Sequence, residues 1–430
     1  MSTATPRLAA LRNHDFRLLW TGQVLSTLGT QMQLTAINWH VYALLRGQTY
    51  SITLFGRAIP LGAEALGLGT LGLVRIVPVL IFALAGGLLA DTLDRRRLMI
   101  ITNVVQIIPA ALLAALSFIG RETVWVLYLL TAIGAAAGTF ETPARQSLVP
   151  NIVPREQMTN AVSLVTLSWQ IGQIVGPALA GVLLAQLNIG VVYAFNVVSF
   201  VAIVVALLRM RYRGGAAERP AGLGPGAVLE GFRFVYREKI VWGTMLLDFF
   251  ATFFSSARTM LPIVAGDVLG IGEIGYGLLS AAQPVGALVA GAITSLRGEI
   301  RRQGIVLLAS VAVYGVATAL FGVSVSTALS FVLLALTGAG DTVSTVIRGT
   351  IRQVVTPDRL RGRMVGVNMM FFMGGPQLGE LEAGLVASLL GAPLAILTGG
   401  IATVLLTALI AWRYPRLRNY TADMMAAAAD

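Results

Sequence analysis

Long apolar runs separated by short polar segments dominate the chain. We count twelve of them: residues 18–45, 68–90, 98–119, 124–147, 160–187, 190–210, 241–268, 275–297, 304–323, 327–351, 362–390 and 393–412. An α-helix needs about 20 residues to cross a hydrocarbon layer of about 30 Å, whereas a membrane β-strand needs only about ten. The pattern therefore predicts an all-α integral membrane protein with twelve transmembrane helices.

Composition limits the kinds of site that the chain offers. Of its 430 residues 56% are hydrophobic and 12% are charged, whereas roughly a quarter of a soluble protein is charged. With no cysteine and only two histidines, His14 and His40, we expect no disulfide, no metal site and no cofactor. We place His40 at the external end of the first span rather than in a proton path. The net charge of +11 follows from where the arginines lie, so we expect a bilayer and no nucleic acid as partner.

The 31 lysines and arginines are unevenly distributed. Arg46, Arg57 and Arg121 fall in odd-numbered connections, and Arg75 and Arg258 fall inside predicted spans. The remainder lie at the two ends of the chain, in even-numbered connections or at the adjoining helix ends. Because basic loops stay on the cytoplasmic side, we expect a multi-pass protein of the cytoplasmic membrane with both termini in the cytoplasm. The first span is too long and too polar for a cleavable signal peptide.

The connection between the second and third runs carries a motif. It reads Gly86-Gly87-Leu88-Leu89-Ala90-Asp91-Thr92-Leu93-Asp94-Arg95-Arg96-Arg97. Two glycines, a carboxylate and three arginines at this spacing resemble the signature loop between helices 2 and 3 of the major facilitator superfamily of transporters. The resemblance implies two pseudo-symmetric six-helix bundles and a small-molecule substrate.

The two halves of the chain repeat one another at a shift of 203 positions. The matched residues are Arg145 with Arg348, Pro154 with Pro357, Gly172 with Gly375, Gly176 with Gly379 and Gly181 with Gly384. Duplicated halves are typical of these transporters. We therefore expect an N-terminal six-helix bundle over 1–210, a cytoplasmic linker with an interfacial helix over 211–240, and a C-terminal six-helix bundle over 241–430.

Charged residues at the predicted cytoplasmic helix ends are candidates for gating. Glu141 and Arg145 are four residues apart, and Asp341 and Arg348 are seven apart, so each pair shares one helix face. We expect these pairs and the signature loop to hold the inner gate shut when the transporter faces outward. The gating set is Gly87, Asp91, Arg95, Arg96, Arg97, Glu141, Arg145, Asp341 and Arg348.

Carboxylates inside predicted spans are candidates for proton coupling, since a charge at membrane depth costs about 2.5–3.5 kcal/mol and needs a reason. Glu380 and Glu382 lie about 200° apart around a helix, so both face one cavity only if the nearby glycines break that helix. A packing pair with an arginine is the alternative for them. Asp248 lies near the end of its span, where simple solvation is the alternative. The expected coupling ion is a proton.

Polar and aromatic residues inside the spans are candidates for substrate binding. In the first span Gln31, Thr35 and Asn38 recur at helical spacing and share one face. Arg258 lies at mid-span, about 15 Å from Asp248 along a straight helix, so the two do not form a simple pair. The other candidates are Arg75, Trp169, Gln173, Phe253 and Phe254.

The fifth run contains a cluster of small residues around a proline, namely Gly172, Gly176, Pro177 and Gly181. Glycines at this spacing give a helix a flat face, and proline removes one backbone hydrogen bond. The cluster resembles the fifth-helix motif of antiporters of the major facilitator superfamily, which implies export. Close packing of two helices is the alternative.

Three further segments, residues 72–78, 247–262 and 357–363, resemble the branch of the superfamily that contains the enterobactin exporter and macrolide-efflux proteins. The resemblance implies a proton-driven exporter of siderophores or amphiphilic drugs. Residues 127–139 contain no arginine, although proton antiporters of the superfamily usually carry a buried one in this helix. Arg75 is a candidate substitute.

Two alternatives stay open at this point. One is uptake or facilitated diffusion of another small solute, since composition does not encode direction. The other is a membrane receptor or enzyme, but the chain has no catalytic Ser/His/Asp set, metal-ligand spacing or phosphate-binding loop. We expect a monomeric transporter without enzymatic activity.

Overall fold

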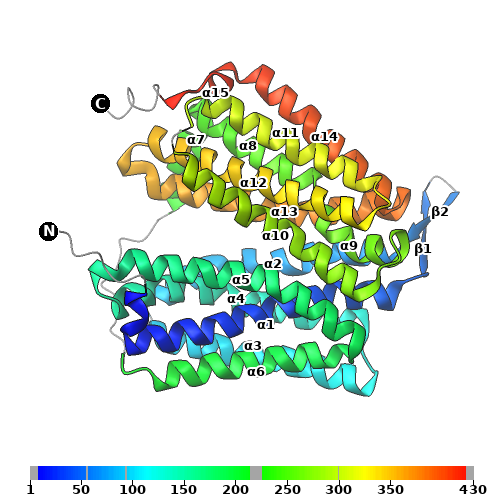
Figure 1. Ribbon diagram of the computed structural model, residues 1–430, viewed down its shortest axis with the longest axis horizontal. Coiled ribbons are helices and arrows are strands. Elements are labelled where there is room, and N and C mark those ends of the chain that lie inside the picture. The colour runs from blue at the N-terminus through cyan, green and yellow to red at the C-terminus, as the bar shows by residue number, and fades with distance from the viewer. Residues whose placement is uncertain (1–7, 55–56, 93, 214–224, 299, 423–430) are drawn as a thin grey trace. The chain divides into compact units, whose positions relative to one another are not determined.

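The computed structural model describes residues 8–54, 57–92, 94–213, 225–298 and 300–422 (Figure 1), except for the side chains of residues 52, 54, 57, 83–92 and 225–228. The chain divides into two compact units. The first comprises Met1–Leu44 and Val74–Ala221, and the second comprises Leu45–Leu73 and Gly222–Asp430. Residues 45–73 thus group with the second half of the chain, although they precede most of the first.

The first unit is a bundle of long helices. Its elements are η1 (Ala9–Arg12), α1 (His14–Leu45), the later part of α2 (Ala63–Thr92), α3 (Arg95–Ile119), α4 (Val124–Ile152), η2 (Arg155–Gln157), α5 (Met158–Gln186) and α6 (Ile189–Arg209). Side-chain caps mark several of the boundaries: Thr123 accepts a hydrogen bond at the start of α4 and Asn188 does so at the start of α6. Such caps satisfy backbone N–H groups that have no partner within the helix.

The second unit contains a short hairpin and a second helical bundle. Its elements are β1 (Thr49–Leu54), β2 (Arg57–Gly62), the beginning of α2, α7 (Pro225–Arg237), α8 (Lys239–Phe254), η3 (Ala257–Met260), α9 (Leu261–Ile263), η4 (Val264–Val268), α10 (Gly272–Arg297), α11 (Gln303–Gly322), α12 (Thr327–Val355), α13 (Asp358–Leu390), α14 (Ala392–Arg413) and α15 (Pro415–Arg418). The linker thus contains a helix, α7, and its interfacial position stays a prediction.

The predicted runs are helical, which confirms the all-α membrane fold. Within the described residues, ten helical segments are long and apolar enough to span a bilayer, and α1 and α13 are not among them. Both are long enough, at 32 and 33 residues, but both are rich in polar residues. A polar helix at membrane depth must face protein or water rather than lipid. The count of twelve crossings stays a prediction.

The connection between α1 and α2 is shorter than the sequence predicted. The prediction places residues 63–67 in a loop, whereas α2 begins at Ala63 and an antiparallel hairpin pairs Thr49 with Gly62 and Leu54 with Arg57. Alanine and leucine favour a helix, and Glu64 in the first turn interacts favourably with the helix dipole. The prediction for these residues is therefore wrong.

The seventh predicted span is not one straight helix. The helix α8 ends at Phe254, and the chain continues through the 3-10 helix η3, the short α9 and the π-helix η4. Pro262 has no N–H to donate to the carbonyl of Arg258, and its ring clashes with that carbonyl in a regular helix. The separation of about 15 Å predicted between Asp248 and Arg258 assumed a straight helix, so that assumption is wrong.

The repeated glycines occupy equivalent contacts in the two units. In the first unit, Cβ atoms added at Gly172 and Gly176 would lie 2.6 Å from Thr27 Cγ2 and 2.7 Å from Gln31 Cβ, so α5 touches α1 there. In the second unit, a Cβ added at Gly379 would lie 2.8 Å from Phe253 Cα, so α13 touches α8. The sequence repeat therefore corresponds to a repeated helix contact.

The beginning of α2 packs against α13 through glycine on both sides. A Cβ added at Gly384 would lie 2.5 Å from Gly69 Cα, and one added at Gly69 would lie 2.7 Å from Gly384 Cα. At such a distance the two backbones touch, as they do at small-residue contacts between membrane helices. This contact joins α2 to α13, the polar helix that carries Glu380 and Glu382.

We predict opposite effects for the same substitution at two glycines of α13. Gly384→Ala forces the helices apart and lowers the unfolding free energy by about 1–3 kcal/mol, the usual effect of overpacking. Gly366→Ala meets no atom within 4 Å and should be neutral or slightly stabilising, because alanine favours helix. Thermal unfolding of the purified protein measures both. Equal effects at the two positions would contradict the contact.

Candidate functional site

A polar face of α1 lies in the first unit. Gln31 and Thr35 are buried and Asn38 is half-buried. Arg75 of α2 donates a hydrogen bond from Nη2 to Asn38 Oδ1 at 2.9 Å, so the structure joins two of the predicted substrate-binding residues. The Thr35 hydroxyl instead donates to the Gln31 carbonyl within its own helix, at 2.9 Å.

The other candidates of the first unit lie on α5. Gln173 is half-buried on the turn between Gly172 and Gly176, which packs on Thr27 and Gln31 of α1. Trp169, one turn earlier, is 47% exposed. The glycines of the antiporter-like motif thus serve at least as a helix contact, while their role in export stays a prediction.

The arginines after the signature loop are held by backbone and side-chain oxygens. Asp94 caps α3 by accepting from the N–H groups of Arg96 and Arg97, at 2.9 and 3.1 Å. The Arg96 side chain donates to the carbonyls of Leu207, Leu208 and Tyr212, at 2.7, 3.0 and 2.8 Å. The Arg96 side chain therefore joins the start of α3 to the end of α6. Its role in gating stays a prediction.

The remaining gating candidates of the first unit form a weaker set. Arg95 Nη1 donates to the Ser147 carbonyl at 3.2 Å, and Arg97 is exposed. Arg145 lies 3.9 Å from Glu141, as the four-residue spacing predicts, and Gln106 Nε2 donates to Glu141 at 3.1 Å. The candidates Gly87 and Asp91 belong to the part of α2 whose side chains lie outside the described residues.

A buried ion-pair cluster ties α8 to α12 in the second unit. Asp248 is only 2% exposed, and its carboxylate lies 2.8 Å from Arg348 Nη2 and 3.5 Å from Arg352 Nη2. Arg348 also lies 3.3 Å from Asp341, the pair predicted from their spacing. The alternative of a solvated Asp248 is therefore wrong.

Further hydrogen bonds complete the surroundings of both arginines. Arg348 donates to Ser344 and Thr345, each at 2.8 Å. Arg352 donates to the Thr244 hydroxyl and carbonyl, each at 2.9 Å, and contacts Asn368 of α13. Sequence analysis missed Arg352, although it lies one helical turn after Arg348 on the same face. The cluster holds three helices, and Asp248 is the carboxylate that pairs with both guanidinium groups.

Aromatic side chains cover the end of α8. Phe249 and Phe253 stack with ring centroids 5.8 Å apart, and Phe253 contacts Phe254 edge to face at 4.9 Å. Arg258 lies beyond the break, in η3, and is exposed. The break thus places Arg258 on a separate element from the phenylalanines, which could present their rings to an apolar part of a substrate.

Glu380 and Glu382 lie on the unbroken helix α13, so they face different directions. A Cβ added at Gly72 would lie 2.8 Å from Glu380 Cβ, which places Glu380 on the side of α13 that meets α2. Glu382 follows Gly379 by three residues and Gly375 by seven, which places it near the side that meets α8. Both side chains are half-buried.

A second buried polar cluster in the first unit was not predicted. His40 is 4% exposed, and its Nδ1 lies 3.0 Å from the Tyr193 hydroxyl. Its Nε2 lies 3.4 Å from Glu122 Oε1. The three residues come from α1, α6 and the segment before α4, and no sequence spacing connects them. Nowhere in the described part of the chain do three His, Cys, Asp or Glu side chains gather as metal ligands.

Comparison with known proteins gives one family match and several relatives. The chain matches the family described as transmembrane secretion effector over residues 5–429. It is 25% identical over 363 residues to the enterobactin exporter EntS of Shigella boydii serotype 4, covering 84% of this chain and 82% of that protein. It is 27% identical over 288 residues to EntS of Salmonella choleraesuis, covering 66% and 68% of the two chains.

Solved structures share the fold at low sequence identity. A bacterial homologue of the human lysosomal transporter Spinster, inward-facing and unoccupied, has a TM-score of 0.70 at 12% identity, covering 96% of this chain and 99% of that one. A bacterial homologue of the iron transporter ferroportin, also inward-facing, has a TM-score of 0.68 at 16% identity, covering 93% and 98%. These matches concern the fold alone.

We predict that Asp248→Asn destabilises the protein by about 3–5 kcal/mol, because it leaves the buried Arg352 without a carboxylate and Arg348 with only Asp341. Asp341→Asn is the matched control, since the Asp341 side chain is 42% exposed, and its effect should be at most about 1 kcal/mol. Thermal unfolding in detergent compares the two. A stable Asp248→Asn protein that loses only its response to pH would contradict a structural role and favour proton coupling.

Proposed function

Because the chain matches the transmembrane secretion effector family along nearly its whole length, it belongs to that family of the major facilitator superfamily, and we propose that it exports an amphiphilic small molecule across the cytoplasmic membrane. The observation that carries the proposal is this match, together with relatives named as enterobactin exporters. The proposed substrate class is a siderophore or a drug-like amphiphile. The proposed mechanism is alternating access driven by proton antiport.

The polar surface of α1 supports a substrate that carries hydrogen-bonding groups. Gln31, Asn38 and Arg75 offer amide and guanidinium groups, and Arg75 and Asn38 already orient one another. In the second unit, the rings of Phe253 and Phe254 offer flat apolar contacts. Ligand sites commonly combine an apolar lining with a few fixed polar groups. We propose that the substrate combines hydrogen-bonding groups with an apolar part.

The ion-pair cluster narrows the candidates for the proton carrier. Asp248 forms salt bridges with Arg348 and Arg352, and we assign it to holding α8 against α12. Glu380 and Glu382 are half-buried on α13. Because α13 is one unbroken helix, the two glutamates lie on different faces of it. A carboxylate that is withdrawn from water favours its neutral form and one that is rehydrated favours its charged form. One of these two glutamates is therefore our proposed proton carrier.

Alternating access requires that each helical bundle moves as a rigid body. In the second unit α8, α12 and α13 are joined by Arg352, which contacts Thr244 and Asn368. In the first unit, Arg96 joins α3 to the end of α6. In transporters built from repeats, alternating access generally occurs by rigid-body rocking of one bundle against the other. Internal cross-links of this kind support rigid-body motion of each unit.

Transport by proteoliposomes tests the proposed function. Vesicles are loaded with a catecholate siderophore or a macrolide, and efflux is measured with and without an imposed pH gradient. We expect efflux that the gradient accelerates at least several-fold. An efflux rate that does not change with the pH gradient would contradict proton antiport and favour facilitated diffusion. Transport in the uptake direction only would contradict export.

We predict that either Glu380→Gln or Glu382→Gln removes the gradient-driven part of this efflux while leaving passive exchange in place. Glutamine keeps the size of the side chain but cannot release a proton. Glu273→Gln is the matched control, because Glu273 is also half-buried and lies at the start of α10. Normal gradient-driven efflux in both α13 variants would remove these glutamates from the coupling mechanism.

A further inference from the structure

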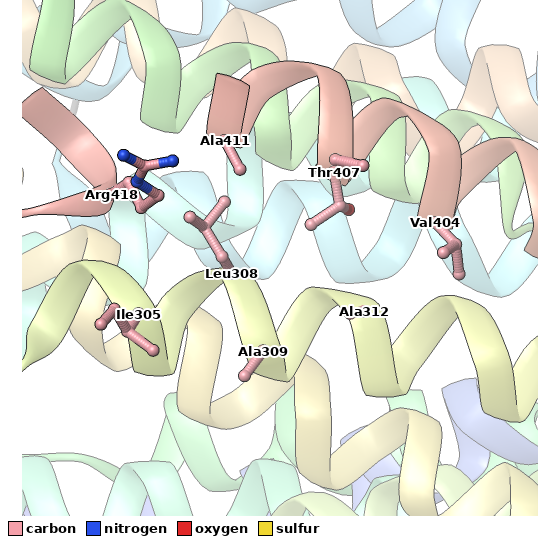
Figure 2. Close-up of a pocket in the computed structure, with 9 residues that line it drawn as sticks. Ile305, Leu308, Ala309, Ala312, Val404, Thr407, Ala411 and Arg418 are labelled. Atoms are coloured by element: carbon pink, nitrogen blue, oxygen red, sulfur yellow. The ribbon is translucent and has the colours of Figure 1, made fainter. Parts of the chain in front are cut away.

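An apolar groove lies between α11 and α14 in the second unit (Figure 2). Its volume is about 360 Å³, and it is open on one side. Residues of α11, α14 and α15 line it: Ile305, Leu308, Ala309, Ala312, Val404, Thr407, Ala408, Ala411 and Arg418. None of these residues belongs to the candidate substrate or proton sites. The groove is therefore a separate feature of the molecule.

The groove exists because α11 and α14 touch on one side of it and α15 closes the other. A Cβ added at Gly315 would lie 3.0 Å from the Gly400 carbonyl oxygen, so the two backbones meet there. At the opposite end, Gly304 leaves room for the Leu417 carbonyl of α15. Between these contacts four of the lining residues are alanines, whose small side chains leave a slot about 10 Å long.

The groove is surrounded by apolar side chains of the kind that face lipid hydrocarbon. Leu405 and Trp412 of α14, beside the groove, are 64% and 73% exposed, and both helices are apolar enough to span a bilayer. The one hydroxyl in the lining belongs to Thr407, and it donates to the Thr403 carbonyl at 2.7 Å. The slot therefore has no polar group of its own to satisfy, except at one end.

That end is formed by Arg418, whose guanidinium group lies beyond Leu308 and Ala411 in Figure 2. Arg418 is exposed, and its Nε donates a long hydrogen bond to Asn419 Oδ1 at 3.4 Å. Among the described residues it has no salt bridge. The planar guanidinium group presents several donors to a phosphate, which it can bind through two oxygens. An apolar slot that ends at such a group matches one lipid chain and its headgroup.

We propose that this groove binds an anionic phospholipid, with one acyl chain in the slot and the headgroup phosphate on Arg418. The lining excludes a polar ligand, because Arg418 alone offers charged donors. The exposed side chains of Leu405 and Trp412 place the groove against the lipid phase rather than in water. Anionic lipids also gather where basic residues meet a membrane surface. The proposal rests on the membrane-spanning character of the family, not on the exported substrate.

Native mass spectrometry of the delipidated full-length protein tests this proposal. Dissociation constants are measured for phosphatidylglycerol and phosphatidylcholine with identical acyl chains. We expect wild type to bind phosphatidylglycerol more tightly. Arg418→Gln should weaken that binding about tenfold, as the loss of charge-assisted hydrogen bonds predicts. Ala309→Leu with Ala408→Leu should fill the slot and weaken binding of both lipids.

Matched controls keep the outcomes distinct. Arg416→Gln removes an exposed arginine of the same short helix that does not line the groove, and Ala328→Leu enlarges an exposed alanine on α12. Neither should change either constant. Unchanged phosphatidylglycerol binding in Arg418→Gln would overturn the phosphate contact, and unchanged binding in the filled variant would overturn the acyl-chain site. Equal binding of water-soluble glycerol phosphate would show a simple anion site and contradict the lipid.

Discussion

Hydrocarbon offers no hydrogen-bond partner, so the protein itself must satisfy every charged group that it places at membrane depth. The second unit does so with one carboxylate and two guanidinium groups. Asp248 lies between Arg348 and Arg352, and the remaining donors of both arginines reach Ser344, Thr244 and their neighbours. Removing Asp248 leaves the buried Arg352 without a carboxylate and Arg348 with only Asp341. This constraint explains why three helices of the unit are held together by polar contacts rather than by apolar packing alone.

The two halves of the chain pair their equivalent arginines with carboxylates in different ways. Arg145 and Arg348 are equivalent by the sequence repeat, and each has an acidic residue on its own helix. Arg145 lies 3.9 Å from Glu141, whereas Arg348 lies 2.8 Å from Asp248 on another helix. The first unit therefore has a local pair, while the second has a cross-link between helices. The glycine contacts, by comparison, are preserved in both units. Packing has been kept through the duplication more closely than charge.

Much of this structure was predictable because apolar length and glycine spacing act locally. The helices, the flat helix face at Gly172 and Gly176, and the Asp341 pair follow from period and spacing alone. The break after Phe254 and the helix start at Ala63 depend on how proline, alanine and glutamate affect local backbone geometry, which hydropathy does not report. Long-range partners could not be predicted. Arg352 and the group of His40, Glu122 and Tyr193 involve residues more than 80 positions apart, and only the fold brings them together.

The central claim is that Asp248 and Arg348 stabilise one another as a buried pair. A double-mutant cycle with Asp248→Asn and Arg348→Met, read by thermal unfolding, tests it most directly. The account predicts that the double variant is more stable than the sum of the two single losses implies, by about 2 kcal/mol or more, because neither member of this pair then remains without the other. Losses that simply add would contradict the account.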